Sequence, residues 1–191
     1  MAATDLSTPA VRVTRIDGRG ALRAWSTAYT FLLLVTFATC ITVDAIPDAG
    51  TPARELLLLK LTAGWNPPPN IALVLSIAAN NTLHSVWPLT LGLLDLQARR
   101  WTRALADAFV IANLILPGLL VGSALAAYGP RTLLYLPHVP IEFAGIAAGA
   151  SGWLVKRDRH LTGRERILWI GATIALLLLA AAIEAYLVPH R

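Results

Sequence analysis

Long stretches without charge alternate with short charged segments along the chain. Four such stretches contain no charged residue, and a fifth is interrupted only by Glu142. A transmembrane helix needs about 20 apolar residues to cross about 30 Å of hydrocarbon at a rise of about 1.5 Å per residue. The pattern therefore predicts five spans: Ala24–Val43, Asn70–Leu96, Ala104–Ala127, Thr132–Val155 and Ile167–Val188.

The segments outside these spans are too short to build a core of their own. Residues 1–23 form a polar N-terminal tail, and residues 44–69 form the longest connection. Within that connection the apolar run Arg54–Leu61 is too short to cross a membrane, and we expect a short helix lying at the membrane interface. The predicted fold is an all-α integral membrane domain over residues 24–188, a bundle of five transmembrane helices.

Composition agrees with this pattern. The chain has 191 residues, of which 56% are hydrophobic and 14% are charged, whereas a soluble domain has about 45–50% apolar and about 25% charged residues. This composition excludes an ordinary water-soluble globule. The single cysteine, Cys40, cannot form an intramolecular disulfide.

The basic residues indicate the orientation, because cytoplasmic flanks collect Lys and Arg. Of the sixteen, twelve lie on the side of the N-terminus: Arg12, Arg15, Arg19, Arg23, Arg99, Arg100, Arg103, Lys156, Arg157, Arg159, Arg164 and Arg166. The other four are Arg54, Lys60, Arg131 and Arg191. We therefore expect a cytoplasmic N-terminus and an extracytoplasmic C-terminus in a bacterial cytoplasmic membrane. The net charge of +5 follows from this bias, so no nucleic-acid partner is expected; anionic lipid or an acidic partner at Lys156–Arg166 is the alternative.

Polar side chains inside hydrocarbon are costly and usually face another helix or a cavity. The second predicted span carries Asn80, Asn81 and His84, and the fourth carries His138 and Glu142. Asn80 and Glu142 each lie ten residues after the start of a span that runs inward, so both are expected about 15 Å from the outer boundary. If these helices touch, Glu142 can accept a hydrogen bond from Asn80 or Asn81, and His84 can pair with Glu142 or His138.

The sequence leaves three uses open for this polar cluster. It can hold helices together by hydrogen bonds, contact a lipid, peptide or partner inside a cavity, or perform acid–base or metal chemistry. The catalytic candidates are His138, Glu142 and His84, since imidazoles and carboxylates transfer protons and bind zinc. The sequence has no His-Glu-x-x-His motif, so neither a metal nor a cofactor is predicted.

Glycines at helical spacing predict close helix packing. Gly145 and Gly149 form a G-x-x-x-G motif that Gly152 extends, on the same helical face as His138 and Glu142 in an unbroken helix. In the third span, Gly118 and Gly122 repeat the motif. We expect both stripes to pack helices within the bundle, and a homodimer interface is the alternative.

Several of these residues resemble the stage II sporulation protein M family of bacterial integral membrane proteins. The resemblance covers Ile71–Val155 and depends on Asn80-Asn81, on Asn113 followed by Gly118 and Gly122, and most specifically on the segment Leu136-Pro137-His138-Val139-Pro140-Ile141-Glu142. Val139, Ala144 and Leu114 depart from the family pattern, as in a divergent member. By position, the resemblance implies that Asn80, Asn81, His138 and Glu142 are the family's polar positions. It implies a scaffold that anchors partner proteins at a membrane, with no metal or cofactor.

Three functional hypotheses follow. The first is a non-enzymatic scaffold that recruits one or more protein partners, expected to be membrane-associated enzymes, alongside membrane lipids. The second is a membrane-embedded subunit of a complex that matures or exports a peptide natural product, with His138 and Glu142 in acid–base or substrate contact. The third is a transport subunit, which would require oligomerisation because five spans are few for a complete transporter.

Overall fold

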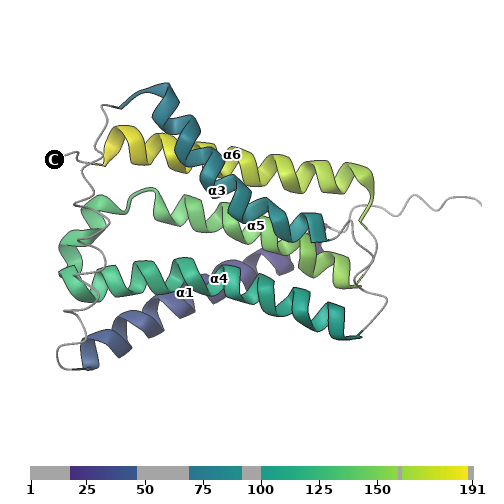
Figure 1. The fold of residues 1–191 in the computed structure, drawn as a ribbon, viewed down its shortest axis with the longest axis horizontal. Helices are drawn as coiled ribbons and strands as arrows, with labels where there is room; N and C mark the ends of the chain where they lie inside the picture. The colour runs from purple at the N-terminus through teal and green to yellow at the C-terminus, as the bar shows by residue number, and fades with distance from the viewer. Residues whose placement is uncertain (1–17, 47–68, 92–99, 159–160, 189–191) are drawn as a thin grey trace, which may run out of the picture.

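The computed structural model describes residues 18–46, 69–91, 100–158 and 161–188, and this part of the chain is helical throughout. The elements are the α-helices α1 (Gly18–Ala45), α3 (Ile71–Leu91), α4 (Arg100–Tyr128), α5 (Val139–Asp158) and α6 (Gly163–Leu187), and the 3-10 helix η2 (Gly129–Tyr135). The five α-helices lie along the long axis of the molecule, and consecutive ones run in opposite directions (Figure 1). The predicted all-helical class is confirmed.

Three of these helices, α1, α4 and α6, are long and apolar enough to cross a membrane. The other two are less apolar for a reason visible in their sequences: α3 contains Asn80, Asn81 and His84, and α5 is rich in glycine and alanine and ends in charged residues. The coarse prediction of a helical membrane protein therefore holds. The two helices that carry the polar residues are those that composition alone does not mark as spans.

The core of the bundle is built around α5. This helix packs against α1, α3 and α6, and more lightly against α4. Every residue from 145 to 153 is buried, and Phe143 and Trp153 are among the largest fully buried side chains. Because its neighbours surround it, α5 does not need the continuous apolar surface that a lipid-facing helix presents.

The predicted fourth span, Thr132–Val155, has the wrong start. Thr132 lies in η2, and the chain turns at Leu136 before α5 begins at Val139. Pro137 explains the break, because the residue before a proline is disfavoured in the helical region. Pro140 lies in the first turn of α5, where its missing N–H costs no intrahelical hydrogen bond.

The other predicted boundaries differ by a few residues. The helices α1, α4 and α6 begin earlier than predicted, at Gly18, Arg100 and Gly163. At α6 the reason is a capping box, in which Thr162 and Glu165 satisfy each other's backbone N–H groups. The second helix ends at Leu91, whereas the predicted residues 92–96, the tail 1–17 and the predicted interfacial helix Arg54–Leu61 lie outside the described residues.

Both glycine stripes lie at contacts between helices. A Cβ at Gly118 would lie 2.8 Å from Val35 Cγ1, and one at Gly122 would lie 3.2 Å from the backbone nitrogen of Cys40, both on α1. On α5, a Cβ at Gly145 would lie 2.9 Å from Leu177 Cδ2 on α6. Further along α5, Gly149 faces the backbone of Ser85, and Gly152 faces Leu89. The stripes thus pack against helices of the same chain.

The start of α4 and the end of α5 are held together by a contact between their side chains. The indole Nε1 of Trp153 donates to Asp107 Oδ1 at 2.9 Å, and Arg157 Nη2 lies 3.4 Å from Asp107 Oδ2. Trp153 is 1% exposed, so its indole N–H depends on this carboxylate.

We expect Asp107→Ala to destabilise the bundle by about 1–2 kcal/mol, because it leaves a buried indole N–H without an acceptor. Asp107→Asn keeps an acceptor oxygen and should retain most of the stability. Arg157 is partly exposed, so Arg157→Ala should cost less than about 1 kcal/mol. Unfolding by SDS titration in mixed micelles measures all three. The control is Asp44→Ala, which changes an exposed carboxylate at the end of α1; an equal loss there would contradict the prediction.

Candidate functional site

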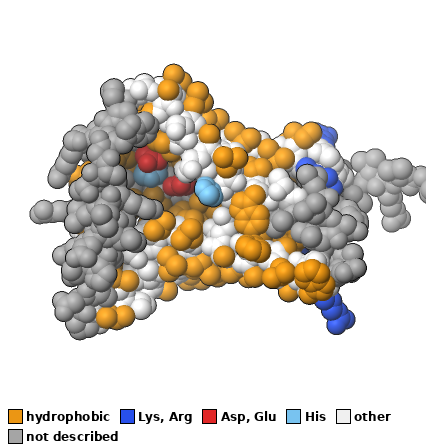
Figure 2. Space-filling view, in the orientation of Figure 1, with side chains coloured by type: hydrophobic (Ala, Val, Ile, Leu, Met, Phe, Trp, Pro, Cys, Tyr) orange, Lys and Arg blue, Asp and Glu red, His pale blue; other side chains and the backbone are white. Residues whose placement is uncertain are grey.

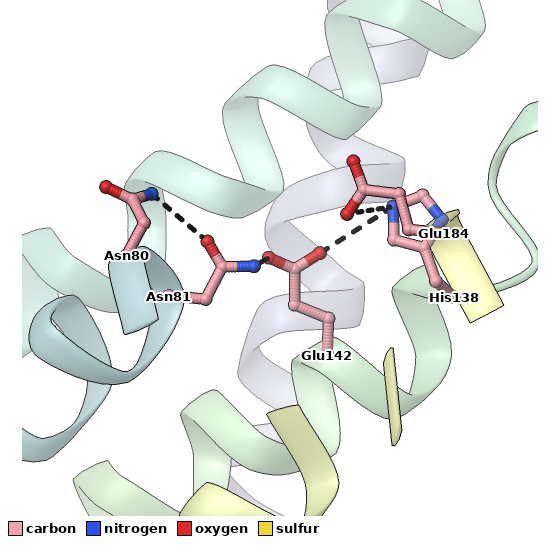
Figure 3. Close-up of polar contacts among 5 residues, drawn as sticks. All are labelled: Asn80, Asn81, His138, Glu142 and Glu184. Carbon is pink, nitrogen blue, oxygen red and sulfur yellow. Dashed lines mark hydrogen bonds and ion pairs between the residues drawn. The ribbon is translucent and has the colours of Figure 1, made fainter. Parts of the chain in front are cut away.

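Five polar side chains from α3, α6 and the start of α5 form one network (Figure 3). Asn80 Nδ2 donates to Asn81 Oδ1 at 3.3 Å, and Asn81 Nδ2 donates to Glu142 Oε1 at 2.9 Å. The second oxygen of Glu142, Oε2, lies 3.9 Å from His138 Nε2. The same imidazole nitrogen lies 3.9 Å from Glu184 Oε2. This network thus links three helices whose residues are far apart in the sequence.

Local structure at the start of α5 positions two of these side chains. His138 directly precedes the helix, and its carbonyl oxygen accepts hydrogen bonds from the backbone N–H groups of Ile141 and Glu142. Glu142 therefore lies in the first turn of α5, one helical turn from His138. This spacing puts imidazole and carboxylate on the same side, facing α3 and α6.

His138 is the least satisfied member of the network. Its side chain is 11% exposed, and its Nδ1 atom is buried without a hydrogen-bond partner among the described residues. Both carboxylate distances of 3.9 Å exceed the length of a direct hydrogen bond. One water molecule can bridge groups at such a distance. The imidazole is therefore placed between two carboxylates without being fixed by either.

The network reaches the surface on one side of the molecule. Figure 2 shows acidic and histidine side chains together in a hollow of a largely apolar face. The side chains of Glu142 and Glu184 are 23% and 37% exposed, and Asn80 is exposed as well. The chain of contacts thus runs from a buried imidazole to the exterior at two points.

Most of the predicted cluster comes together, with two corrections. Asn81 and Glu142 form the hydrogen bond that the sequence predicts. His84 does not join, because it lies exposed on α3 and makes no hydrogen bond or ion pair within the described residues. The position of Glu142 within its helix also differs: it lies three residues after the start of α5 at Val139, rather than ten residues into a longer helix.

Glu184 is the member that the sequence analysis missed. It is the only acidic residue in the second half of α6 and lies close to the end of that helix. Its approach to His138 becomes predictable only when α5 is known to begin at Val139. The start of α5, with His138 and Glu142, then lies beside the end of α6 that carries Glu184.

The arrangement does not form a metal centre. Within the described residues no group of three His, Cys, Asp or Glu side chains is placed to hold a metal ion. The candidate zinc ligands His84, His138 and Glu142 are therefore not placed together as a metal-binding group, and His84 lies exposed on α3. The residues that are present can share hydrogen bonds. They can also hold or exchange a proton among two carboxyl groups and an imidazole.

Comparisons with family models, with curated proteins and with solved structures return no match. The geometry of the network therefore carries the functional argument.

Proposed function

We propose that the protein is a five-helix subunit of a bacterial cytoplasmic membrane, with its N-terminus inside and its C-terminus outside, and that it acts as a non-enzymatic scaffold for partner proteins. The alternating direction of α1, α3, α4, α5 and α6 supports five crossings (Figure 1). The basic side chains in Figure 2 gather at one end of the body, away from the acidic hollow. This separation is what the cytoplasmic preference of Lys and Arg produces.

The observation that carries the scaffold proposal is the hydrogen bond from Asn81 to Glu142, which joins α3 to α5. With Glu184 contributed by α6, the polar groups connect helices to one another, as polar residues commonly do inside membranes. Two surface hollows of the described part are lined by other residues, one along α1 and one near Leu89 and Arg166. The polar side chains therefore hold the helices of the bundle together, and the outer surface of the bundle is available to partners.

One observation favours an alternative, a membrane-embedded subunit of a peptide-modifying or export complex. His138 Nε2 lies 3.9 Å from both carboxylates, and the network opens to the exterior through Asn80 and Glu184. Such an arrangement can carry a proton between the surface and a buried imidazole. In that case Glu142 acts directly on the substrate, or it passes a proton between the substrate and His138.

The substitution Glu142→Gln separates the two functions. Its amide oxygen still accepts the hydrogen bond from Asn81, while the group can no longer exchange a proton. A scaffold should keep its partner: we expect the variant to co-purify with the same membrane-associated enzyme as the wild-type chain after mild detergent extraction. A proton-transferring subunit should assemble equally well and lose its product.

Asp44→Asn is the matched control, because it makes the same chemical change at an exposed carboxylate outside the network. Mass spectrometry of the purified complex measures whether the partner is retained, and mass spectrometry of the product measures whether it is formed. A wild-type chain that purifies alone under every mild extraction would contradict the scaffold proposal.

A further inference from the structure

One helix surface differs from the others in what it exposes. On α3 the residues Ala72, Ser76, Asn80 and His84 are all exposed. They follow one another at intervals of four, so they form a single ridge along the helix. The neighbouring exposed row, Leu75, Ala79 and Leu83, is apolar. The α3 ridge, as we call the first row, is small at its outer end and polar along its remaining length.

The corresponding surfaces of α4 and α6 are apolar. Between residues 104 and 125 of α4 and between residues 167 and 182 of α6, the exposed side chains that the structure describes are aliphatic or aromatic, apart from Gly171. The exposed face of α1 has hydroxyls, and apart from Thr30 they donate to backbone carbonyls of their own helix: Ser26 at 3.0 Å, Thr27 at 2.8 Å and Thr42 at 2.7 Å. A hydroxyl satisfied in this way tolerates lipid.

The polar side chains of the α3 ridge do not bond to backbone carbonyls of their own helix in this way. His84 and Ser76 make no hydrogen bond within the described residues, and Asn80 uses only its amino group, toward Asn81. An amide oxygen and an imidazole left in hydrocarbon are costly, and helices carrying them usually pair with another helix. Within the described residues, therefore, the ridge lacks hydrogen-bond partners for these groups, and a membrane helix packed beside α3 would supply them.

The chemistry of the ridge points to a second copy as that neighbour. Serine, asparagine and neutral histidine each carry both a donor and an acceptor, so the ridge is complementary to itself. It contains no Asp, Glu, Lys or Arg that a like partner would repel. A two-fold axis along the membrane normal brings equal residues of two copies to the same depth, so that each Asn80 faces Asn80 of the other copy. Ala72 and Ser76 are small enough for the backbones to approach closely.

We propose that the protein forms a parallel two-fold dimer in the membrane through the α3 ridge. The interface pairs Asn80 and His84 with the same residues of the second copy. Through Asn80 and Asn81 it also connects the two polar networks into one. This dimer goes beyond the proposed scaffold function and does not depend on it, since two copies can associate whether or not a partner is recruited.

Cysteine cross-linking in native membranes tests the dimer. In a Cys40→Ala background, which removes the only native cysteine, Ala79→Cys places a thiol beside Asn80 on the exposed side of α3. We expect oxidation to give a band at twice the chain mass of 20.5 kDa. The matched controls Ala112→Cys on α4 and Ala175→Cys on α6 are equally exposed alanines and should remain monomeric.

A second measurement tests the polar contacts themselves. Adding His84→Leu should weaken dimerisation about threefold to thirtyfold, as measured by energy transfer between labelled chains diluted in lipid, whereas His84→Gln should retain it. The proposal is overturned if Ala79→Cys stays monomeric, if it cross-links only to a protein of different mass, or if the controls cross-link equally well. Partner co-purification is scored separately, so either proposal can fail alone.

Discussion

Gly149→Ala should prevent the bundle from closing, with a loss of about 3 kcal/mol or more, at or beyond the upper end of the usual range for overpacking. The added Cβ would meet the carbonyl oxygen and carbon of Ser85 on α3. A backbone group cannot move aside as a side chain can, so α3 and α5 would have to separate. Separation would also pull Asn81 away from Glu142. Because whole domains are stable by only about 5–15 kcal/mol, the variant should accumulate poorly in membranes and unfold early in an SDS titration.

Two other glycines provide a graded control for this prediction. Gly152 faces the end of the Leu89 side chain, which can change rotamer, so Gly152→Ala should cost clearly less than Gly149→Ala. Gly171 on α6 has nothing within 4 Å of an added Cβ, and Gly171→Ala should be neutral or stabilising by up to about 1 kcal/mol through helix propensity. Equal losses at all three positions would show that the close approach of α3 and α5 is not the cause.

The sequence predicts the packing role of these glycines but not their partners. Their spacing on one helical face indicates a close contact, and that inference needs only the helical period. Which helix lies against Gly149 depends on how five helices are arranged, and spacing within one helix has no information about that arrangement. The structure assigns Gly118 and Gly122 to α1, and the α5 stripe to α3 and α6.

The polar cluster was also predictable only in part: the sequence indicates which residues take part, but not how the helices bring them together. Asn81 and Glu142 stand out because polar groups are rare inside apolar segments, and such groups tend to find one another. The position of Glu142 within its helix was not predictable from charge-free length, because residues 132–138, which follow Arg131 through the rest of η2 and the turn at Leu136, are as uncharged as a helix. Recognising the helix start at Val139 would have required giving more importance to Pro137 and Pro140 than to hydropathy. That start is also what brings Glu184 into reach of His138.

Asn81→Leu should destabilise the bundle by about 1.5–3 kcal/mol, because it removes the one direct hydrogen bond that the described residues make to the Glu142 carboxyl group. The carboxyl group would remain between helices without that bond, 3.9 Å from His138 Nε2. Asn80→Leu is the neighbouring control, measured in dilute micelles where chains are separate. Its single bond, at 3.3 Å, goes to Asn81 at an exposed position, so its cost should stay below about 1 kcal/mol.

A double-mutant cycle shows whether Asn81 acts through Glu142. Replacing both residues by leucine removes donor and acceptor together, and apolar replacement of a whole polar pair is often nearly neutral. We therefore expect Asn81→Leu combined with Glu142→Leu to be more stable than the sum of the single losses predicts, with a coupling free energy of about 1–2 kcal/mol. A coupling near zero would mean that the two side chains are neighbours without stabilising each other, and the network could then not be what holds α3 against α5.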